Sequence, residues 1–138
     1  MILLDTSGLF AALDSAQRRH TEAAACLAAA TPPLLLSPFV LAELDYLLAN
    51  RVGEAARLSL LGEVERGAYQ LQPFTATNVH KAHAVIQRHA DLGISLADAS
   101  IVVLAGHHRI QDVLTLDERH FRVLSANEKS FRLLPSDE

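Results

Sequence analysis

Two patterns of apolar residues alternate along this chain and predict its architecture. Short apolar or alternating segments predict strands at residues 1–4, 34–36, 69–74, 112–115 and 131–134. Segments with apolar residues at helical spacing predict helices at about residues 8–13, 17–30, 38–50, 53–66, 75–90 and 95–108. Short strands separated by helices indicate an α/β layer fold with a mainly parallel sheet. Ligand sites in such sheets form at the carboxyl ends of the strands.

The composition supports a sizeable core. The chain has 138 residues, of which 50% are apolar and 20% charged, and this predicts a single domain over residues 1–138. The formal net charge of −4 excludes a basic protein that coats nucleic acid. An RNA substrate is still possible, because bound cations can neutralise an acidic site locally.

The cysteine content and the hydropathy indicate a protein of the cytoplasm. Cys26 is the single cysteine, so neither an internal disulfide nor a thiolate zinc site can form. No signal-peptide pattern precedes Asp5, and no apolar stretch approaches the roughly 18–20 residues that cross a bilayer. We therefore expect cytoplasmic localisation and no membrane contact.

Four carboxylates depart from the apolar patterns. Asp5 directly follows the first predicted strand, and Asp117 lies two residues after the strand that ends at Thr115. Both are expected at the carboxyl edge of the sheet. Glu43 and Asp98 share helix faces with apolar residues, at positions where a core-facing helix would prefer leucine.

Each carboxylate alone has an ordinary structural explanation. Asp98 can form a capping box with Ser95, Asp5 can cap a helix, and Asp117 can form an Asx turn. However, a buried carboxylate without a partner is costly, and no Lys or Arg is expected on the apolar faces that carry Glu43 and Asp98. A divalent cation would balance the four charges. Oxygen ligands without cysteine favour Mg²⁺ or Mn²⁺, so the pattern predicts a metal site.

The segments that carry these acids resemble those of a PIN-domain nuclease, in the same order and near the same spacing. They are residues 3–9 (LLDTSGL), 40–46 (VLAELDY), 95–101 (SLADASI) and 114–121 (LTLDERHF). Over essentially its whole length the chain resembles the VapC toxins of bacterial toxin–antitoxin pairs. The resemblance implies a PIN-like fold, with a mainly parallel central sheet of about four to five strands flanked by helices.

The resemblance also implies an activity and partners. It implies an endoribonuclease that depends on Mg²⁺ or Mn²⁺, cuts tRNA or ribosomal RNA, forms a homodimer and is inhibited by a VapB-type antitoxin. Its acidic cluster is carried over onto Asp5, Glu43, Asp98 and Asp117. Some PIN domains have a further acidic residue soon after the fourth, and here His120 stands in that segment.

Our hypothesis for the mechanism gives each acid a role. Asp5, Asp98 and Asp117 hold the metal, directly or through water, and Glu43 orients the attacking water. Residues expected to position these carboxylates or to touch a phosphate are Thr6, Ser7 and Thr115. Candidate substrate contacts are Arg51, Arg109, Arg119 and His120.

Two other functions remain open on the sequence. An aspartyl-phosphate phosphoryl-transfer protein also places an Asp directly after its first strand, but usually has a second acid two residues later, where this chain has Ser7. Formation of an acyl-phosphate on Asp5 would support it. A catalytically silent PIN-fold binding module would keep the fold and neither bind metal nor cleave RNA.

Overall fold

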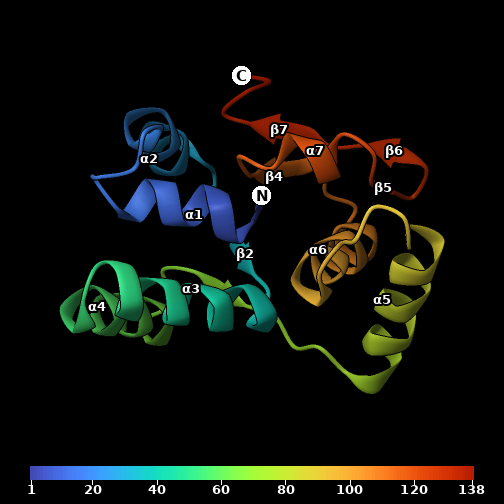
Figure 1. Cartoon of the computed structure of the whole chain (residues 1–138), viewed down its shortest axis with the longest axis horizontal. Helices are drawn as coiled ribbons and strands as arrows, with labels where there is room; N and C mark the ends of the chain where they lie inside the picture. Colours follow the sequence, from blue (N-terminus) through green and yellow to red (C-terminus); the bar gives the residue numbers. More distant parts are fainter.

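The central sheet has five strands, all of them parallel. The computed structural model describes residues 1–138 and arranges the strands in the order β3-β2-β1-β4-β7 (Figure 1). The strands are β1 Ile2–Leu4, β2 Leu34–Leu36, β3 Gln70–Leu71, β4 Asp112–Leu114 and β7 Arg132–Leu134. Each neighbouring pair is parallel. The predicted α/β class and parallel sheet are therefore confirmed.

Seven helices flank this sheet. They are α1 Thr6–Leu13, α2 His20–Ala29, α3 Pro38–Arg51, α4 Glu54–Glu65, α5 Ala76–Arg88, α6 Leu96–His108 and α7 Glu118–Phe121. Helix α1 packs against α2 and α3, α3 packs against α4, and α5 packs against α6. Figure 1 shows the α3–α4 pair at the lower left of the view and the α5–α6 pair at the lower right, and α6 contacts α3.

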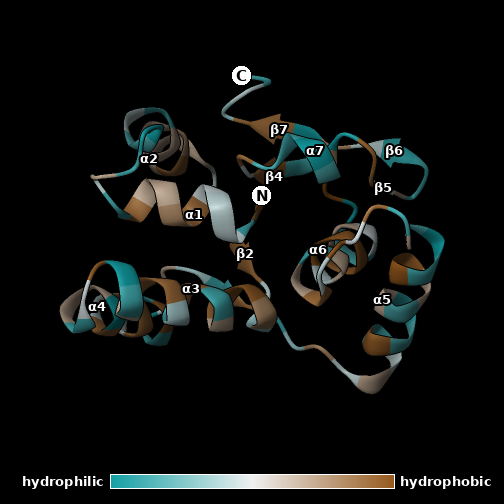
Figure 2. Cartoon of the chain, in the orientation of Figure 1, coloured by the Kyte–Doolittle hydropathy of each residue, from teal (hydrophilic) through white to brown (hydrophobic).

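The core surrounds the sheet because its inner strands are buried on both faces. Every residue of β1 is buried, and Leu35, Leu36 and Leu114 of the adjacent strands are at most 1% exposed. Burial on both faces explains why these strands are continuous apolar runs in the sequence. In Figure 2 hydrophobic residues colour the central strands, and hydrophilic ones colour the outer turns of the helices.

Helix α6 is buried along most of its length. Every residue from Ala97 to Ala105 is buried, and the helix contacts β1, α3 and α5. This central helix is not amphipathic, because neighbouring elements cover it on several sides. Asp98, in the first turn of this helix, is therefore buried as well.

Helix α1 approaches the end of β4 very closely at Gly8. A Cβ atom at this position would overlap the carbonyl group of Leu114. Glycine therefore allows the first turn of α1 to lie against the carboxyl end of β4, which brings residues 5–7 to that edge of the sheet.

The structure departs from the predicted elements where they are short. The strand predicted over residues 69–74 is reduced to Gln70–Leu71, and the helix predicted from residue 17 begins at His20. Helix α7 was not predicted, nor was the hairpin of β5 Ser125–Ala126 and β6 Lys129–Ser130. Elements of two to four residues are too short to establish a period in the sequence. No helix has the length and apolar character needed to cross a membrane.

Candidate metal centre at the carboxyl edge of the sheet

Two adjacent strands bring Asp5 and Thr115 to the same edge. The Asp5 N–H donates to the Leu114 carbonyl at 3.0 Å, which continues the pairing of β1 with β4. Thr115 Oγ1 donates to Asp5 Oδ2 at 2.7 Å, and Ser7 Oγ donates to the same oxygen at 2.9 Å. Asp5 lies at the N-cap of α1, but its side chain makes no capping hydrogen bond. Asp5 therefore occupies the predicted cap position, but capping does not account for its carboxylate.

Burial makes the charged form of Asp5 unfavourable. The residue is 4% exposed, and desolvation raises the pKa of its carboxyl group from the ordinary 3.8 to about 6. Hydrogen bonds from Thr115 and Ser7 act in the opposite direction, and the charge of Asp98 raises the pKa further, but burial is the largest cause. A cation beside Asp5 would offset this cost.

The hydroxyl groups that hold Asp5 also hold the segment leading to Asp117. Ser7 Oγ accepts a hydrogen bond from the Leu116 N–H at 2.9 Å. Thr115 Oγ1 accepts one from the Asp117 N–H, also at 2.9 Å. Ser7 and Thr115 therefore fix the carboxylate of Asp5 relative to the backbone that carries Asp117.

Asp98 is oriented by the start of its helix. The Ser95 side chain accepts a hydrogen bond from the Asp98 N–H at 3.0 Å, and Asp98 Oδ2 accepts one from the Ser95 N–H at 3.1 Å. The expected capping box is therefore present. The capping box uses one carboxylate oxygen of Asp98 and holds the carboxylate at the N-terminus of α6. The Asp98 side chain is 13% exposed.

Asp117 and His120 come together on one short helical turn. Asp117 caps α7, since its Oδ1 accepts a hydrogen bond from the His120 N–H at 3.0 Å. His120 Nδ1 then lies 2.8 Å from Asp117 Oδ2 and 3.5 Å from Asp98 Oδ2. In spite of these short distances, this buried nitrogen has no hydrogen-bond partner in acceptable geometry. One ligand atom from each of the three residues lies within 4.8 Å of the others.

Glu43 lies on α3 at the side of this group. Val40, Leu44 and Leu48 of the same helix are buried, but Glu43 is exposed. The expectation that Glu43 points along the apolar stripe is therefore wrong, because it lies at the border of the stripe. Its Oε1 accepts a hydrogen bond from Thr6 Oγ1 at 2.6 Å, which ties it to the residue after Asp5.

An open cavity of about 450 Å³ adjoins Glu43. It is lined by Thr6, Ala42, Glu43, Tyr46 and Leu47. Tyr46 is 68% exposed, which is unusual for a large aromatic side chain. The Glu43 carboxylate is thus accessible to a large molecule from outside, whereas Asp5 and Asp98 lie deeper.

No Lys or Arg balances the acids of this edge. The ion pairs formed by arginine involve other acids, which are Glu22, Asp45, Glu54, Asp112, Glu118 and Asp137. His120 is the one basic side chain that contacts the group. Several carboxylates close together without a lysine or arginine fit a divalent cation, and the unpartnered His120 Nδ1 offers it a further ligand atom.

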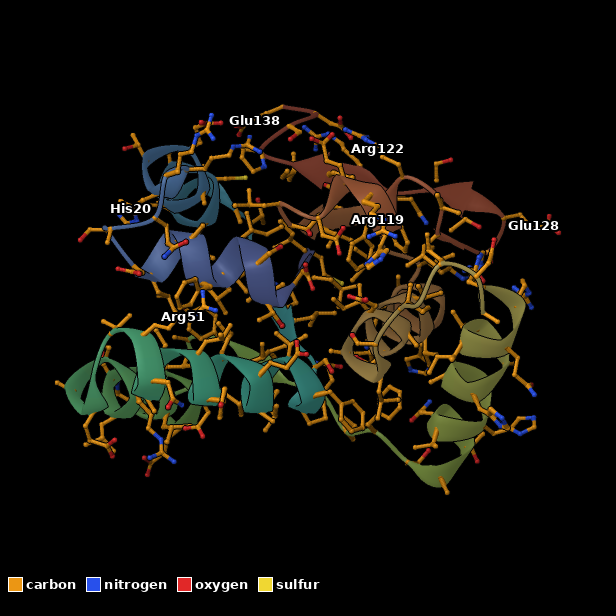
Figure 3. The ribbon with its side chains drawn as sticks, viewed as in Figure 1. His20, Arg51, Arg119, Arg122, Glu128 and Glu138 are labelled. Atoms are coloured by element: carbon orange, nitrogen blue, oxygen red, sulfur yellow. The ribbon has the colours of Figure 1, made fainter.

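The arginines expected to contact substrate are distributed differently. Arg119 is exposed on α7, between Asp117 and His120 in the sequence. Arg51 ends α3, and Figure 3 shows it on the side of the molecule away from α7. Arg109 caps the opposite end of α6 from Asp98, so the structure does not bring it to the acidic group.

Comparison with known proteins identifies the family. Residues 2–126 match the model of the PIN domain. Over 123 residues, the chain is 41% identical to ribonuclease VapC26 of Mycobacterium tuberculosis, a match that covers 89% of this chain and 91% of the relative. The chain belongs to the VapC-type PIN-domain ribonucleases.

A solved structure of the same family has the same fold. The crystal structure of VapC20 of Mycobacterium tuberculosis, a toxin that cleaves the sarcin-ricin loop, matches with a TM-score of 0.80. The sequences are 26% identical, and the match covers 85% of this chain and 90% of the other. The PIN-like fold implied by the four sequence motifs is therefore confirmed.

His120 lies closer to the acidic group than its sequence position indicated. His120 was expected as a substrate contact, but its Nδ1 lies between two carboxylates of the acidic group. The spacing of three residues between Asp117 and His120 could have indicated that their side chains lie together. A residue three positions after an acid that caps a helical turn lies on the same side of that turn.

Proposed function

We propose that this PIN-domain protein is an endoribonuclease toxin that depends on a divalent cation, Mg²⁺ or Mn²⁺, and cleaves tRNA or ribosomal RNA. The observation that carries the proposal is the pair of Asp98 and Asp117 within ligand distance of each other, at the edge of the sheet that also carries the buried Asp5, without a lysine or arginine to balance them. The relatives named ribonuclease VapC26 and sarcin-ricin loop cleaving toxin support RNA as the substrate.

The chain's own residues divide the work of phosphodiester cleavage. Asp5, Asp98 and Asp117 would hold the cation, which when bound lowers the pKa of water and neutralises charge on the phosphate. Glu43 orients the attacking water and accepts its proton, and Thr6 holds the Glu43 carboxylate through their 2.6 Å hydrogen bond. Ser7 and Thr115 keep Asp5 in place.

The reaction that we propose is an in-line hydrolysis. The oxygen of water forms a bond to phosphorus, and the bond between phosphorus and the 3′ oxygen breaks. The products carry a 5′-phosphate and a 3′-hydroxyl group, and the 3′ oxygen takes up a proton as it leaves. The open cavity beside Glu43 supports entry of the RNA from the side of α3.

The proposal includes the biological setting of the family. We infer that the protein works as one domain over residues 1–138, as a homodimer in the cytoplasm, and that a VapB-type antitoxin inhibits it. The supporting observation is the VapC relative, which matches over 89% of this chain.

The test is cleavage of purified ribosomes and total tRNA in the presence of Mn²⁺ or Mg²⁺. We expect a discrete cut with a 5′-phosphate end, which is lost in EDTA and in Asp98→Asn. Asp91→Asn, which removes the charge of an exposed aspartate next to α5, is the matched control and should cut normally. Failure to cut either RNA, together with failure to bind Mn²⁺, would contradict the proposal and favour a silent binding module.

A further inference from the structure

We propose that His120 is a direct ligand of the cation through Nδ1, and that this nitrogen makes the site prefer a divalent first-row transition ion, such as Mn²⁺, to Mg²⁺. The proposal rests on the proposed function, because it concerns the same cation site. It goes further by assigning a ligand outside the four carboxylates and a choice between ions.

The Nδ1 atom of His120 lies where the carboxylates of Asp98 and Asp117 come close together. His120 Nδ1 is 2.8 Å from Asp117 Oδ2 and 3.5 Å from Asp98 Oδ2, and its exposed surface is essentially zero. Buried polar atoms in native structures nearly always have a partner. The absence of one here, at the point where two carboxylates converge, indicates that a ligand completes the site.

The backbone that carries the His120 ring is held by several hydrogen bonds. The His120 N–H donates to Asp117 Oδ1, and the His120 carbonyl accepts hydrogen bonds from the N–H groups of Val123 and Leu124, each at 3.0 Å. The side chain is 18% exposed and follows the turn of α7, whose next residue, Phe121, is buried in the core. These bonds therefore fix the backbone of His120, and with it the point from which the side chain extends, before any ion binds.

Helix α7 is also anchored from its outer side. Arg122 pairs with Glu118 and with Asp137, each at 2.7 Å, and Asp137 in turn accepts a hydrogen bond from the Leu133 N–H. Figure 3 shows Arg122 on the side of the molecule near the C-terminus. Because this arginine is engaged with Glu118 and Asp137, it does not neutralise Asp98 or Asp117.

The alternative is an ion pair in which a charged His120 neutralises Asp117. In that case Nδ1–H would donate to Asp117 Oδ2, and 2.8 Å is an ideal distance for this bond. The relative orientation of the two groups does not satisfy the geometry of a hydrogen bond, and Nδ1 remains without a partner. The positions of His120 Nδ1 and Asp117 Oδ2 fit two ligands of one cation better than they fit a hydrogen-bond donor and its acceptor.

The ligand type then determines which ion is preferred. Mg²⁺ takes oxygen ligands in near-ideal octahedral geometry, so an imidazole nitrogen adds little to its binding. Divalent first-row transition ions bind imidazole together with carboxylates more readily than Mg²⁺ does, and Mn²⁺ has the weakest affinity among them for such sites. A site in which an imidazole joins the carboxylates should therefore discriminate against Mg²⁺ more strongly than a site made of carboxylates alone.

The test is electron spin-echo envelope modulation of Mn²⁺ bound to the full-length protein, which detects a directly coordinated nitrogen. We expect nitrogen modulation in the wild-type protein and its loss in His120→Gln. His83→Gln, which removes an exposed histidine of α5, is the matched control and should keep the signal. Bound Mn²⁺ without nitrogen modulation would overturn the ligand assignment and leave the proposed nuclease intact.

Equilibrium binding supplies a second, independent measurement. His120→Gln should weaken Mn²⁺ binding about tenfold or more and change Mg²⁺ binding much less. His120→Asp should move the preference toward Mg²⁺, because it restores an oxygen ligand. Equal losses for both ions in both variants would overturn the proposed selectivity. A wild-type protein that binds neither ion would overturn the proposed function itself.

Discussion

Asp5 and Glu43, two acids of the proposed site, have opposite surroundings. Asp5 is buried and receives two hydroxyl hydrogen bonds, whereas Glu43 is exposed and receives one, from Thr6. Burial makes the charged form of Asp5 unfavourable, and a bound cation would compensate for this, so Asp5 is suited to act as a metal ligand. The exposed carboxylate can reach both water and substrate, which suits a group that handles a proton. The two residues therefore respond to substitution in different ways.

For the metal-free protein, we expect the free energy of unfolding to fall as the pH rises from about 4 to about 6. The pKa of Asp5 is about 6 in the folded state against 3.8 ordinarily, so in this window the folded chain holds a proton that the unfolded chain has released. The stability that this proton provides is complete below about pH 4 and is lost above about pH 6. A difference of about two pH units between the folded and unfolded pKa of Asp5 corresponds to a loss of about 3 kcal/mol in the free energy of unfolding.

Asp5→Asn should remove this contribution. Urea unfolding in EDTA between about pH 4 and pH 7 measures it, and the variant should be more stable than the wild-type protein at pH 7. Asp91→Asn, which changes an exposed carboxylate, should follow the wild-type curve. Identical pH dependence in Asp5→Asn and in the wild type would show that Asp5 is charged at little cost.

Glu43→Gln should abolish cleavage while the cation still binds. Removing a general base typically lowers the rate by about 10²- to 10⁴-fold. Because Glu43 is exposed, the free energy of unfolding should change by less than about 0.5 kcal/mol. Single-turnover cleavage and a Mn²⁺ titration separate the two effects. Glu65→Gln, at an exposed position on α4, is the control, and a Glu43→Gln protein that cleaves normally would contradict the role of Glu43.

The sequence named all four acids and His120 as candidates, but local rules account for the placement of Asp5, Asp98 and Asp117 and not for that of Glu43 and His120. Asp5 and Asp117 follow strands, which places them at the carboxyl edge of the sheet, and Asp98 follows a capping serine, which places it at the start of its helix. The exposure of Glu43 depends on how α3 rotates against its neighbours, which its own sequence does not determine. The position of His120 depends on α7, a helix of four residues that has no periodic signal.

At the scale of elements, the site depends on the fit of α1 against β4. The first turn of α1 carries Thr6 and Ser7, which hold Glu43 and Asp5. That turn can lie against the carboxyl end of β4 because residue 8 has no side chain. A small change in the distance between these two elements would therefore move both hydroxyl groups away from the carboxylates.

Gly8→Ala should destabilise the protein by about 1–3 kcal/mol and lower the rate of cleavage, because its Cβ would overlap the backbone of Leu114. Gly62→Ala is the matched control within α4. Its Cβ would meet the flexible side chain of Arg66 at 3.1 Å, and alanine is the better helix former by about 1 kcal/mol. Thermal unfolding and cleavage of both variants provide the comparison. Equal stability of the two variants would show that α1 can move away from β4 without cost.

At the scale of the whole molecule, the alternation of strands and helices was sufficient to predict the parallel sheet. Strands buried on both faces are distinct as short apolar runs, and the helices between them are long enough to show a period. The order β3-β2-β1-β4-β7 places β1 and β4 side by side, so residues from opposite ends of the chain meet at one edge. This order is a property of three-dimensional packing, and it makes the site a feature of the complete fold.

A cation should for this reason stabilise the whole molecule. Asp5, Asp98 and Asp117 come together when β1, α6 and β4 pack, whereas in the unfolded chain they are far apart, so the ion binds the folded state selectively. Mn²⁺ at a hundredfold excess over its Kd should add about 2.7 kcal/mol to the free energy of unfolding. For a domain of this size, this corresponds to a rise in Tm of about 10 °C.

Thermal unfolding of the full-length protein with Mn²⁺ and with EDTA measures this effect. Asp98→Asn should lose the Mn²⁺-dependent rise in Tm. Glu65→Gln, which changes an exposed residue at the end of α4, should keep it. A rise in Asp98→Asn equal to that of the wild type would mean that Mn²⁺ binds elsewhere on this acidic protein. The size of the rise follows the Kd, so a smaller rise in His120→Gln than in His83→Gln would connect the stability of the whole fold to the single nitrogen atom of α7.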